Sequence, residues 1–350
     1  MIDFTVAIPT YNGADRLPLV LDRLRSQLNT ASFTWEIIVV DNNSSDATAT
    51  VVRHYQTSWA GSTLRYVWEA EQGAAFARQR AIDEANGRWV GFLDDDNLPA
   101  DDWVANAYEF GRTHPTVGAY GSQIRGDFEV APPADFRRIA CFLAIVDRGA
   151  TAQRYEPRQK LLPPGAGLVV RKQAWEAAVP KRLVLNHTGK AAKLASEDLE
   201  VVLHIQNAGW EIWHNPMMQV NHKIPQWRLE RDYLISLVQC VGLSRHHLRM
   251  MRLQPWQRSL SVPIYLGNDV RKFLLHWLKY RRATEENAIV ACEREFLFSS
   301  ILSPFHLWQK IHLKRQQAAP LTQFVAKVPH KALVSNLDLA KTAYPSSGEV

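Results

Sequence analysis

Residues 89–97 read Trp-Val-Gly-Phe-Leu-Asp-Asp-Asp-Asn, an apolar run that ends in three adjacent carboxylates. An apolar run of this length, bounded by a glycine and a proline, predicts a buried strand of a parallel sheet whose carboxyl end opens into a cleft. Side chains alternate along a strand, so we expect Asp94 and Asp96 on one face and Asp95 on the other.

Three like charges this close repel and raise one another's pKa unless a cation neutralises them. Carboxylate oxygens are the ligands that Mg²⁺ and Mn²⁺ prefer, so the acidic stretch predicts a divalent-metal site. Taken alone, residues 94–97, Asp-Asp-Asp-Asn, fit a solvated acidic turn equally well, because this composition is common on protein surfaces.

The chain has 350 residues and is 46% hydrophobic, which suits one large globular domain, alone or with an appendage. Its three cysteines, Cys141, Cys240 and Cys292, are odd in number and far apart, which suits neither a disulfide framework nor a zinc site. We find no export-signal pattern at the N-terminus and no run approaching the roughly 18 apolar residues of a spanning helix. The expectation is a cytoplasmic protein.

Upstream of residue 89 the sequence repeats the pattern of strand, polar loop and helix. Strands are predicted at 4–8, 35–40 and 64–68. The first is followed by helical periodicity at 17–28, the second by a helix that ends at about residue 55, and the third by a helix from Gly73 to about residue 85. This alternation implies right-handed crossovers and a parallel sheet that binds ligands beyond the carboxyl ends of its strands. The loops at 9–13 and 41–46 and the acidic stretch all fall at that edge.

Two nucleotide-binding classes are disfavoured. No G-x-G-x-x-G follows the first strand and no G-x-x-x-x-G-K-[ST] occurs, which argues against a dinucleotide oxidoreductase and a P-loop ATPase. If phosphate binds at this edge, a metal must therefore neutralise much of its charge.

Four stretches resemble, in order, the motifs of family 2 glycosyltransferases with the GT-A fold: 6–12, 38–46, Gly73 with Ala77-Arg78, and 92–96. The resemblance covers roughly residues 4 to 225, and four ordered motifs are more specific than any one of them. It implies an α/β fold of GT-A type, Rossmann-like, with a mostly parallel sheet flanked by helices. Gln79 departs from the family, where Asn is common after the Ala-Arg pair.

The resemblance implies a binding site for a nucleotide-diphosphate sugar, with UDP-sugars favoured. Asp96 would hold Mg²⁺ or Mn²⁺ bridging the diphosphate. The implied nucleotide contacts are Pro9, Thr10, Tyr11, Asn12, Asp41, Asn43, Arg78, Asp94 and Asp95. From the residues alone, Asp41 is also explained as a turn or helix-capping residue and Arg78 as an exposed helix charge.

A helix is predicted from Ser196, as its N-cap, to about residue 208, with Glu197 and Asp198 in its first turn. Helix stability alone favours these acids there. An inverting transfer, however, needs a carboxylate that accepts the acceptor's proton. The resemblance assigns that base to Asp198 and an acceptor contact to Glu197.

The resemblance also places Gly165 and Gly167 along the acceptor side, although a plain turn explains these glycines as well. Strands are predicted at 210–214 and 217–220, with a turn at Asn215-Pro216 between them. His222 follows the last strand. A lone histidine is most often structural, but the resemblance suggests that His222 completes the metal shell.

We predict three regions: a GT-A domain at 1–225, a helical, basic region at 226–317 and a partly disordered tail at 318–350. The middle region has 15 basic residues against seven acidic ones, in a chain whose formal net charge is only +6. It carries two apolar stripes, one of Leu229, Tyr233, Leu234, Leu237, Val238 and Val241 and one of Val270, Phe273, Leu274, Trp277 and Leu278. Basic residues beside the second stripe fit a helix on an anionic membrane, peripheral at the inner face of the cytoplasmic membrane. Alternatively, both stripes pack on the catalytic domain.

These observations favour a metal-dependent, inverting glycosyltransferase that moves one sugar to a glycan or lipid-linked acceptor, in cell-surface or exopolysaccharide assembly, with no nucleic-acid partner. Gln226-Trp227-Arg228 is not the Q-x-x-R-W motif of processive synthases in the family. A sugar-phosphate nucleotidyltransferase is an alternative, but residues 9–13 lack the basic, Gly-rich loop it needs. A catalytically silent nucleotide-sugar-binding module is another.

Overall fold

The computed structural model describes residues 2–157, 161–187, 194–281 and 287–318. The chain divides into two compact units, Met1–Pro304 and Phe305–Val350. The disordered tail predicted at 318–350 lies, after its first residue, outside the described residues. The predicted boundary at 225 stays a prediction.

The parallel core of the sheet forms as the sequence predicts. Its strands are β1 (Phe4–Thr10), β2 (Trp35–Asp41), β3 (Thr63–Trp68) and β4 (Trp89–Phe92), in the spatial order β3-β2-β1-β4. All three pairings in this group are parallel, so their carboxyl ends meet at one edge. This arrangement is the α/β fold that the four motifs imply.

The second half of the sheet is mixed. It contains β5 (Asn97–Pro99), β6 (Val117–Phe128), β7 (Gln153–Arg154), β8 (Val169–Arg171) and β9 (Glu211–Ile224). Strand β8 lies antiparallel between β4 and β6, β9 runs parallel to β6, and β5 and β7 pair antiparallel with β9. The antiparallel β5–β9 pair carries the residues after the acidic stretch toward the end of the last strand.

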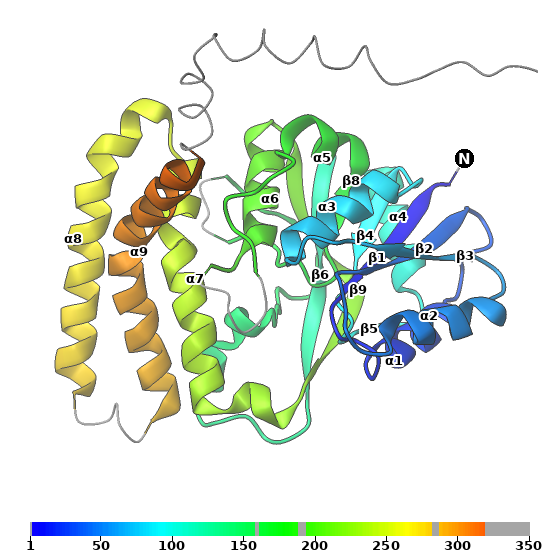
Figure 1. The fold of residues 1–350 in the computed structure, drawn as a ribbon, viewed down its shortest axis with the longest axis horizontal. Coiled ribbons are helices and arrows are strands. Elements are labelled where there is room, and N and C mark those ends of the chain that lie inside the picture. The colour runs from blue at the N-terminus through cyan, green and yellow to red at the C-terminus, as the bar shows by residue number, and fades with distance from the viewer. Residues whose placement is uncertain (1, 158–160, 188–193, 282–286, 319–350) are drawn as a thin grey trace, which may run out of the picture. The chain divides into compact units, whose positions relative to one another are not determined.

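Helices cover both faces of the sheet (Figure 1). One apolar core holds buried residues of α1 (Leu17–Arg25), α2 (Thr48–Thr57) and α4 (Trp103–Thr113), and the other holds those of α3 (Ala74–Glu84), α5 (Lys172–Ala178) and α6 (Glu197–Asn207). Along β2, Ile37 and Val39 enter the first core while Ile38 and Val40 enter the second. A strand buried on both faces is apolar at most positions, as β1 and β2 are. Among the buried polar exceptions, Thr5 and Glu36 satisfy each other, since the Thr5 hydroxyl donates to Glu36 Oε1 at 3.0 Å.

The turn predicted at Asn215-Pro216 is wrong, because β9 runs through it. Its register with β6 jumps there: Asn215 pairs with Ser122, but the next residue of β6, Gln123, pairs with Gln219. Proline has no N–H to donate to a ladder, so the strand bulges around Pro216 and then resumes its pairing.

The C-terminal part is helical, with η4 (Gln226–Leu229), α7 (Arg231–Met251), α8 (Pro255–Tyr280) and α9 (Ala288–Ala318). Leu229 of η4 and Leu234 and Val238 of α7 are buried in a third apolar core. That core also contains residues of two short 3₁₀ helices, η1 (Phe136–Arg138) and η2 (Ala140–Leu143). The first predicted apolar stripe therefore packs against the protein. No helix among the described residues is long and apolar enough to cross a membrane.

Candidate active site

The acidic stretch is a turn rather than the end of a strand. Strand β4 ends at Phe92, and the turn is closed by the Asn97 N–H, which donates to the Asp94 carbonyl at 3.0 Å. The prediction that Asp94 and Asp96 share one face of a strand is therefore wrong. The turn aims the three carboxylates in different directions.

Each carboxylate of this turn is paired with a different arginine. The pairs are Arg78 with Asp94 at 3.0 Å, Arg16 with Asp95 at 2.8 Å and Arg228 with Asp96 at 2.7 Å. The mutual repulsion expected of three adjacent aspartates is thus offset inside the protein by three guanidinium groups.

Asp95 joins the acidic turn to the loop after β1. The guanidinium of Arg16 donates to both Asp95 oxygens, and the Thr10 hydroxyl donates to Oδ2 at 2.6 Å. Gly13 lies against this pair, since a Cβ there would stand 2.1 Å from the Thr10 hydroxyl oxygen. Burial raises the pKa of Asp95, although its hydrogen bonds with Arg16 act in the opposite direction. These contacts shape the loop on which the nucleotide contacts are predicted.

Asp96 and His222 come together as predicted for a metal site. Asn97 of β5 pairs with His222 of β9, which brings the neighbouring Asp96 carboxylate to 3.4 Å from His222 Nε2. His222 Nδ1 lies 2.9 Å from the Leu143 carbonyl oxygen. This contact orients the imidazole so that Nε2 faces the Asp96 carboxylate, and Nε2 is the nitrogen that would bind a metal.

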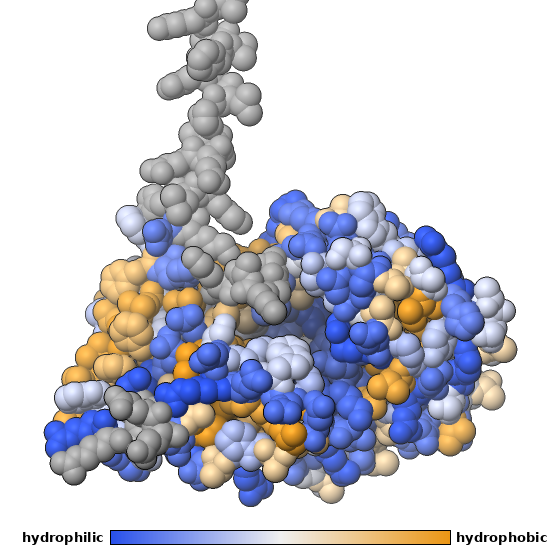
Figure 2. Space-filling model, turned by 60° about the horizontal axis from the view of Figure 1, so that its bottom comes forward, coloured by the Kyte–Doolittle hydropathy of each residue, from blue (hydrophilic) through white to orange (hydrophobic). Residues whose placement is uncertain are grey.

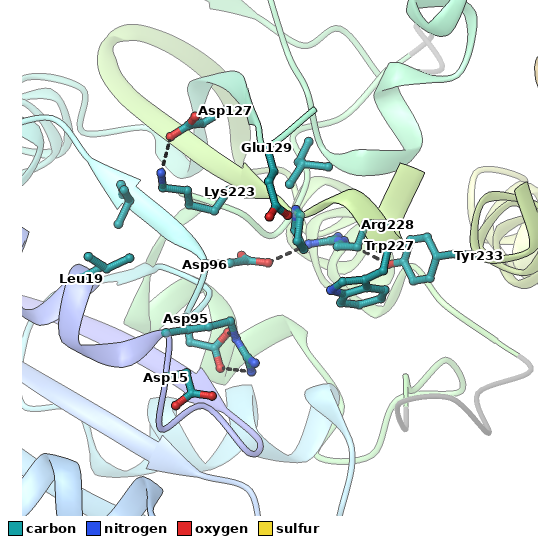
Figure 3. Close-up of a pocket in the computed structure, with 14 residues that line it drawn as sticks. Asp15, Leu19, Asp95, Asp96, Asp127, Glu129, Lys223, Trp227, Arg228 and Tyr233 are labelled. Carbon is teal, nitrogen blue, oxygen red and sulfur yellow. Dashed lines mark hydrogen bonds and ion pairs between the residues drawn. The ribbon is translucent and has the colours of Figure 1, made fainter. Parts of the chain in front are cut away.

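A guanidinium nitrogen already lies between these two groups. Arg228 Nη1 is 2.7 Å from Asp96 Oδ2 (Figure 3). The same nitrogen is 3.0 Å from His222 Nε2. Although burial alone would raise the pKa of Asp96, its contacts with His222 and the charge of Arg228 lower it.

The pair fits Mg²⁺ or Mn²⁺. A carboxylate oxygen and an imidazole nitrogen supply two ligands of suitable type, and the described residues contain no cluster of three or more His, Cys, Asp or Glu side chains that could hold a metal. A cation at Asp96 and His222 would therefore complete its shell with water or substrate oxygens, and it would have to displace Arg228.

A second constellation surrounds Arg78. This buried guanidinium donates to Glu197 Oε1 at 2.6 Å and to Asp94 Oδ1 at 3.0 Å. A Cβ on Gly165 would lie 2.8 Å from Arg78 Nη2 and 3.1 Å from the Asp198 Cβ, so a side chain there would push the Arg78 guanidinium away from its ion pairs. Arg78 thereby connects the acidic turn to the first turn of α6.

Asp198 is held by two backbone donors, Gly165 N–H at 2.6 Å and Leu199 N–H at 2.8 Å. Desolvation and the neighbouring charge of Glu197 raise the pKa of Asp198 to about 6, against the opposing effect of Arg78. A carboxylate with this pKa is well matched to accept a proton near neutral pH. Ser196 lies at the predicted N-cap position, but its side chain makes no capping hydrogen bond.

Gly167 has a backbone reason to be glycine. Its φ is +64°, and a Cβ there would stand 2.4 Å from the Ser122 hydroxyl oxygen. The Ser122 hydroxyl group in turn donates a hydrogen bond to the Gly167 carbonyl oxygen at 2.7 Å. These constraints support the plain-turn explanation of the glycine and leave the acceptor contact a prediction.

The loops after β1 and β2 are brought together by the pairing of Thr10 with Asp41. Asp41 accepts from the Ser44 N–H at 2.9 Å and from the Tyr66 hydroxyl at 2.7 Å, as its turn interpretation expects. Asn12 Oδ1 accepts from the Ser45 N–H at 2.8 Å. The remaining predicted nucleotide contacts on these loops, Pro9, Tyr11 and Asn43, are partly or fully exposed.

Asn42, which the sequence analysis does not single out, fixes the position of the second loop. Its side-chain oxygen accepts from the Gly73 N–H at 2.7 Å and its amide donates to the Glu71 carbonyl at 2.8 Å, which ties the second loop to the start of α3. Its position directly after Asp41 is the one signal in the sequence that could have found it.

A cavity of about 710 Å³ opens beside the acidic turn (Figure 3). Trp227 and Tyr233 form an aromatic side of it, edge to face with ring centres 5.0 Å apart, and Trp227 is 53% exposed. Its cations are each paired with a lining carboxylate, Arg16 with Asp95, Arg228 with Asp96 and Lys223 with Asp127. Asp15 and Glu129 also line it, so the cavity has more carboxylates than cations.

The fold and the paired loops at the carboxyl edge of the sheet define a GT-A architecture. Residues 5–174 match the family model described as "Glycosyl transferase family 2", so this part of the chain is a glycosyltransferase domain of that family.

The chain is similar to curated glycosyltransferases over part of their length. It is 34% identical over 106 residues to the putative teichuronic acid biosynthesis glycosyltransferase TuaG of Bacillus subtilis, covering 30% of this chain and 40% of that protein. It is 32% identical over 100 residues to glycosyltransferase AglE of Haloferax volcanii, covering 29% and 32%. The chain thus spans less than half the length of either relative.

Among solved structures, the mannosyltransferase PcManGT from Pyrobaculum calidifontis, in complex with GDP-Man and Mn²⁺, superposes with a TM-score of 0.56. The alignment has 21% identity and covers 87% of each chain. This likeness concerns the fold.

Proposed function

We propose that the protein is a metal-dependent, inverting glycosyltransferase that moves a single sugar from a nucleotide-diphosphate donor. The observation that supports this proposal best is the state of Asp198. Two backbone N–H groups fix its carboxylate, its pKa is about 6, and it lies at the same sheet edge as the Asp96–His222 pair. An acid–base group and a cation site at one edge are the two components that this transfer needs.

In the proposed reaction, the acceptor hydroxyl oxygen forms the new bond to the sugar C1 while the bond from C1 to the diphosphate oxygen breaks. Asp198 takes the hydroxyl proton, and the nucleoside diphosphate leaves. A divalent cation held by Asp96 and His222 would stabilise the negative charge of the leaving diphosphate. Arg78 would orient Asp94 and Glu197 around the donor sugar through its ion pairs.

The loops after β1 and β2 are the proposed nucleotide site, through the residues predicted for it from Pro9 to Asn43. A UDP-sugar is the favoured donor. A nucleotidyltransferase remains the weaker candidate, since residues 9–13 have no lysine or arginine to bind a nucleoside triphosphate.

The donor proposal is tested by thermal unfolding of the full chain with UDP, GDP or dTDP, each with and without Mn²⁺. A rise in Tm is expected for the preferred nucleotide when Mn²⁺ is also present, because ligands that bind the native state stabilise it by mass action. A nucleotide that stabilises the protein equally in the presence of a chelator would contradict the metal-dependent mechanism.

For the acceptor we propose the aromatic side of the cavity beside the acidic turn, formed by Trp227 and Tyr233. Asp95 and Asp96, which also line this cavity, belong to the proposed donor and cation site. An exposed indole offers an apolar face to a sugar ring, and carboxylates accept hydrogen bonds from hydroxyls. Asp15 and Glu129 add carboxylates to the cavity beyond its three ion pairs, which disfavours an anionic acceptor, so we propose that the acceptor sugar is neutral or amino-substituted.

The Trp227→Ala variant is expected to raise the acceptor KM by up to about tenfold and to leave the donor KM unchanged, because a contact with an aromatic face contributes about 0.5–1.5 kcal/mol. Steady-state kinetics with each substrate varied in turn measure both constants. Met217→Ala, an exposed apolar residue outside the cavity, is the matched control. A rise in the donor KM alone would assign the cavity to the donor instead.

A further inference from the structure

Helix α8 presents an apolar stripe to solvent. Trp256, Leu260, Ile264, Leu274 and Leu278 are 72%, 65%, 68%, 50% and 59% exposed. Their spacing places them on one face of the helix. Figure 2 shows hydrophobic surface on the left of the molecule, the side where Figure 1 places α8. Of the two stripes predicted from the sequence, α7 buries its own and α8 exposes much of the other.

The opposite face of α8 is anchored to the protein. Asp269 is buried and accepts from both terminal nitrogens of Arg249 on α7, at 2.5 and 2.9 Å. His276 Nε2 lies 3.2 Å from Glu293 Oε2 on α9. The helix therefore has a defined inner face, and the outward direction of its apolar stripe follows from that anchoring.

The exposed charges of α8 have one sign. Asp269 is its only acidic residue and is buried, whereas the exposed charged residues of the helix are Arg258, Arg271, Lys272 and Lys279. By helical spacing, Arg271 lies within the apolar stripe, and Lys272 and Lys279 lie along one edge of it. An apolar face with only cations exposed beside it complements a surface that is apolar in depth and anionic at its boundary.

We propose that α8 docks on an anionic lipid surface, with its axis in the plane of the interface and the Trp256–Leu278 stripe among the acyl chains. The stripe from Trp256 to Leu278 extends over about 33 Å of the helix, at about 1.5 Å per residue. A second copy of the chain fits less well, because a contact through this stripe would bury the Arg271 guanidinium of each copy within an apolar interface. Docking would deepen the proposed function by favouring a lipid-linked acceptor, but it can be measured without sugar transfer.

The test is co-flotation of the full chain with phosphatidylcholine vesicles that contain or lack phosphatidylglycerol. We expect binding to the anionic vesicles, weakened by added salt, and at least about tenfold less binding to vesicles of phosphatidylcholine alone. A Leu260→Glu, Ile264→Glu double variant should lose binding by about tenfold or more, because two charges replace inserted side chains.

Leu28→Glu is the control, since Leu28 is a similarly exposed leucine, at 57%, far from α8 in the sequence. Equal Tm values for all proteins would confirm that the substitutions leave the fold intact. The proposal is overturned if anionic vesicles do not bind the protein or bind the double variant as well as the parent. It is also overturned if light scattering detects a dimer that the double variant abolishes, which would assign the stripe to a second copy.

Discussion

The Asp198→Asn variant is expected to lose sugar transfer, with kcat reduced about a thousandfold and the donor Kd changed less than twofold. Removing a general base typically lowers the rate by about 10²–10⁴-fold, and the expected loss lies within this range. Asparagine has nearly the same shape, and its carbonyl oxygen can still accept the Gly165 N–H. Transfer assays and donor titration of the same preparation measure the two effects separately.

The pH profile is part of the same expectation. Asp198 must be ionised to accept a proton, so the logarithm of kcat should rise with unit slope up to a pH of about 6 and then level off. The raised pKa also means that the native state binds a proton more tightly than the unfolded chain. Stability from this group is thus lost as pH rises from about 4 to 6, and the asparagine variant should be at least as stable as the parent above pH 6.

Asp101→Asn, on an exposed aspartate outside the site, is the matched control. Retention of parental transfer rates by the Asp198 variant would show that another group is the base. If the parent itself binds the donor and transfers nothing, the alternative of a silent nucleotide-sugar-binding module is the correct one.

The Asp96→Asn variant is expected to lose Mn²⁺-dependent nucleotide binding, with the Kd for Mn²⁺ in the presence of nucleotide raised about a hundredfold or more. The substitution removes the anionic ligand of the proposed pair and leaves His222 alone to hold the cation. Electron paramagnetic resonance of free Mn²⁺ and calorimetry of nucleotide binding measure the loss.

Arg228 provides a comparison of opposite sign. Its guanidinium lies between the two candidate ligands, so Arg228→Gln should tighten Mn²⁺ binding in the absence of nucleotide by removing a competing cation. If both variants weaken Mn²⁺ binding alike, Arg228 supports the site instead of competing for it. If neither changes it, the metal binds elsewhere.

Long-range pairings explain what the sequence could not predict about the site. Asp96 and His222 were predicted together only through the family resemblance, and Arg228, which lies 132 positions from Asp96, was not predicted at all. No local pattern indicates which arginine pairs with which aspartate. Arg228 reaches Asp96 because the β5–β9 pairing brings the end of β9, and η4 after it, beside the acidic turn. Similarly, the proline at 216 is a valid local turn signal that the extended pairing of β6 with β9 overrides.

The sequence by itself determined the parallel sheet and the edge at which the site forms. Largely apolar strands that alternate with helices favour a parallel sheet over other folds. Because parallel strands end at a common edge, the loops at 9–13, 41–46 and 94–96 lie near one another. Tertiary structure decided which apolar stripe is buried, since α7 and α8 have similar patterns and differ only in what packs against them. It also decided the ionisation of Asp198, because burial and neighbouring charges act through space and not along the chain.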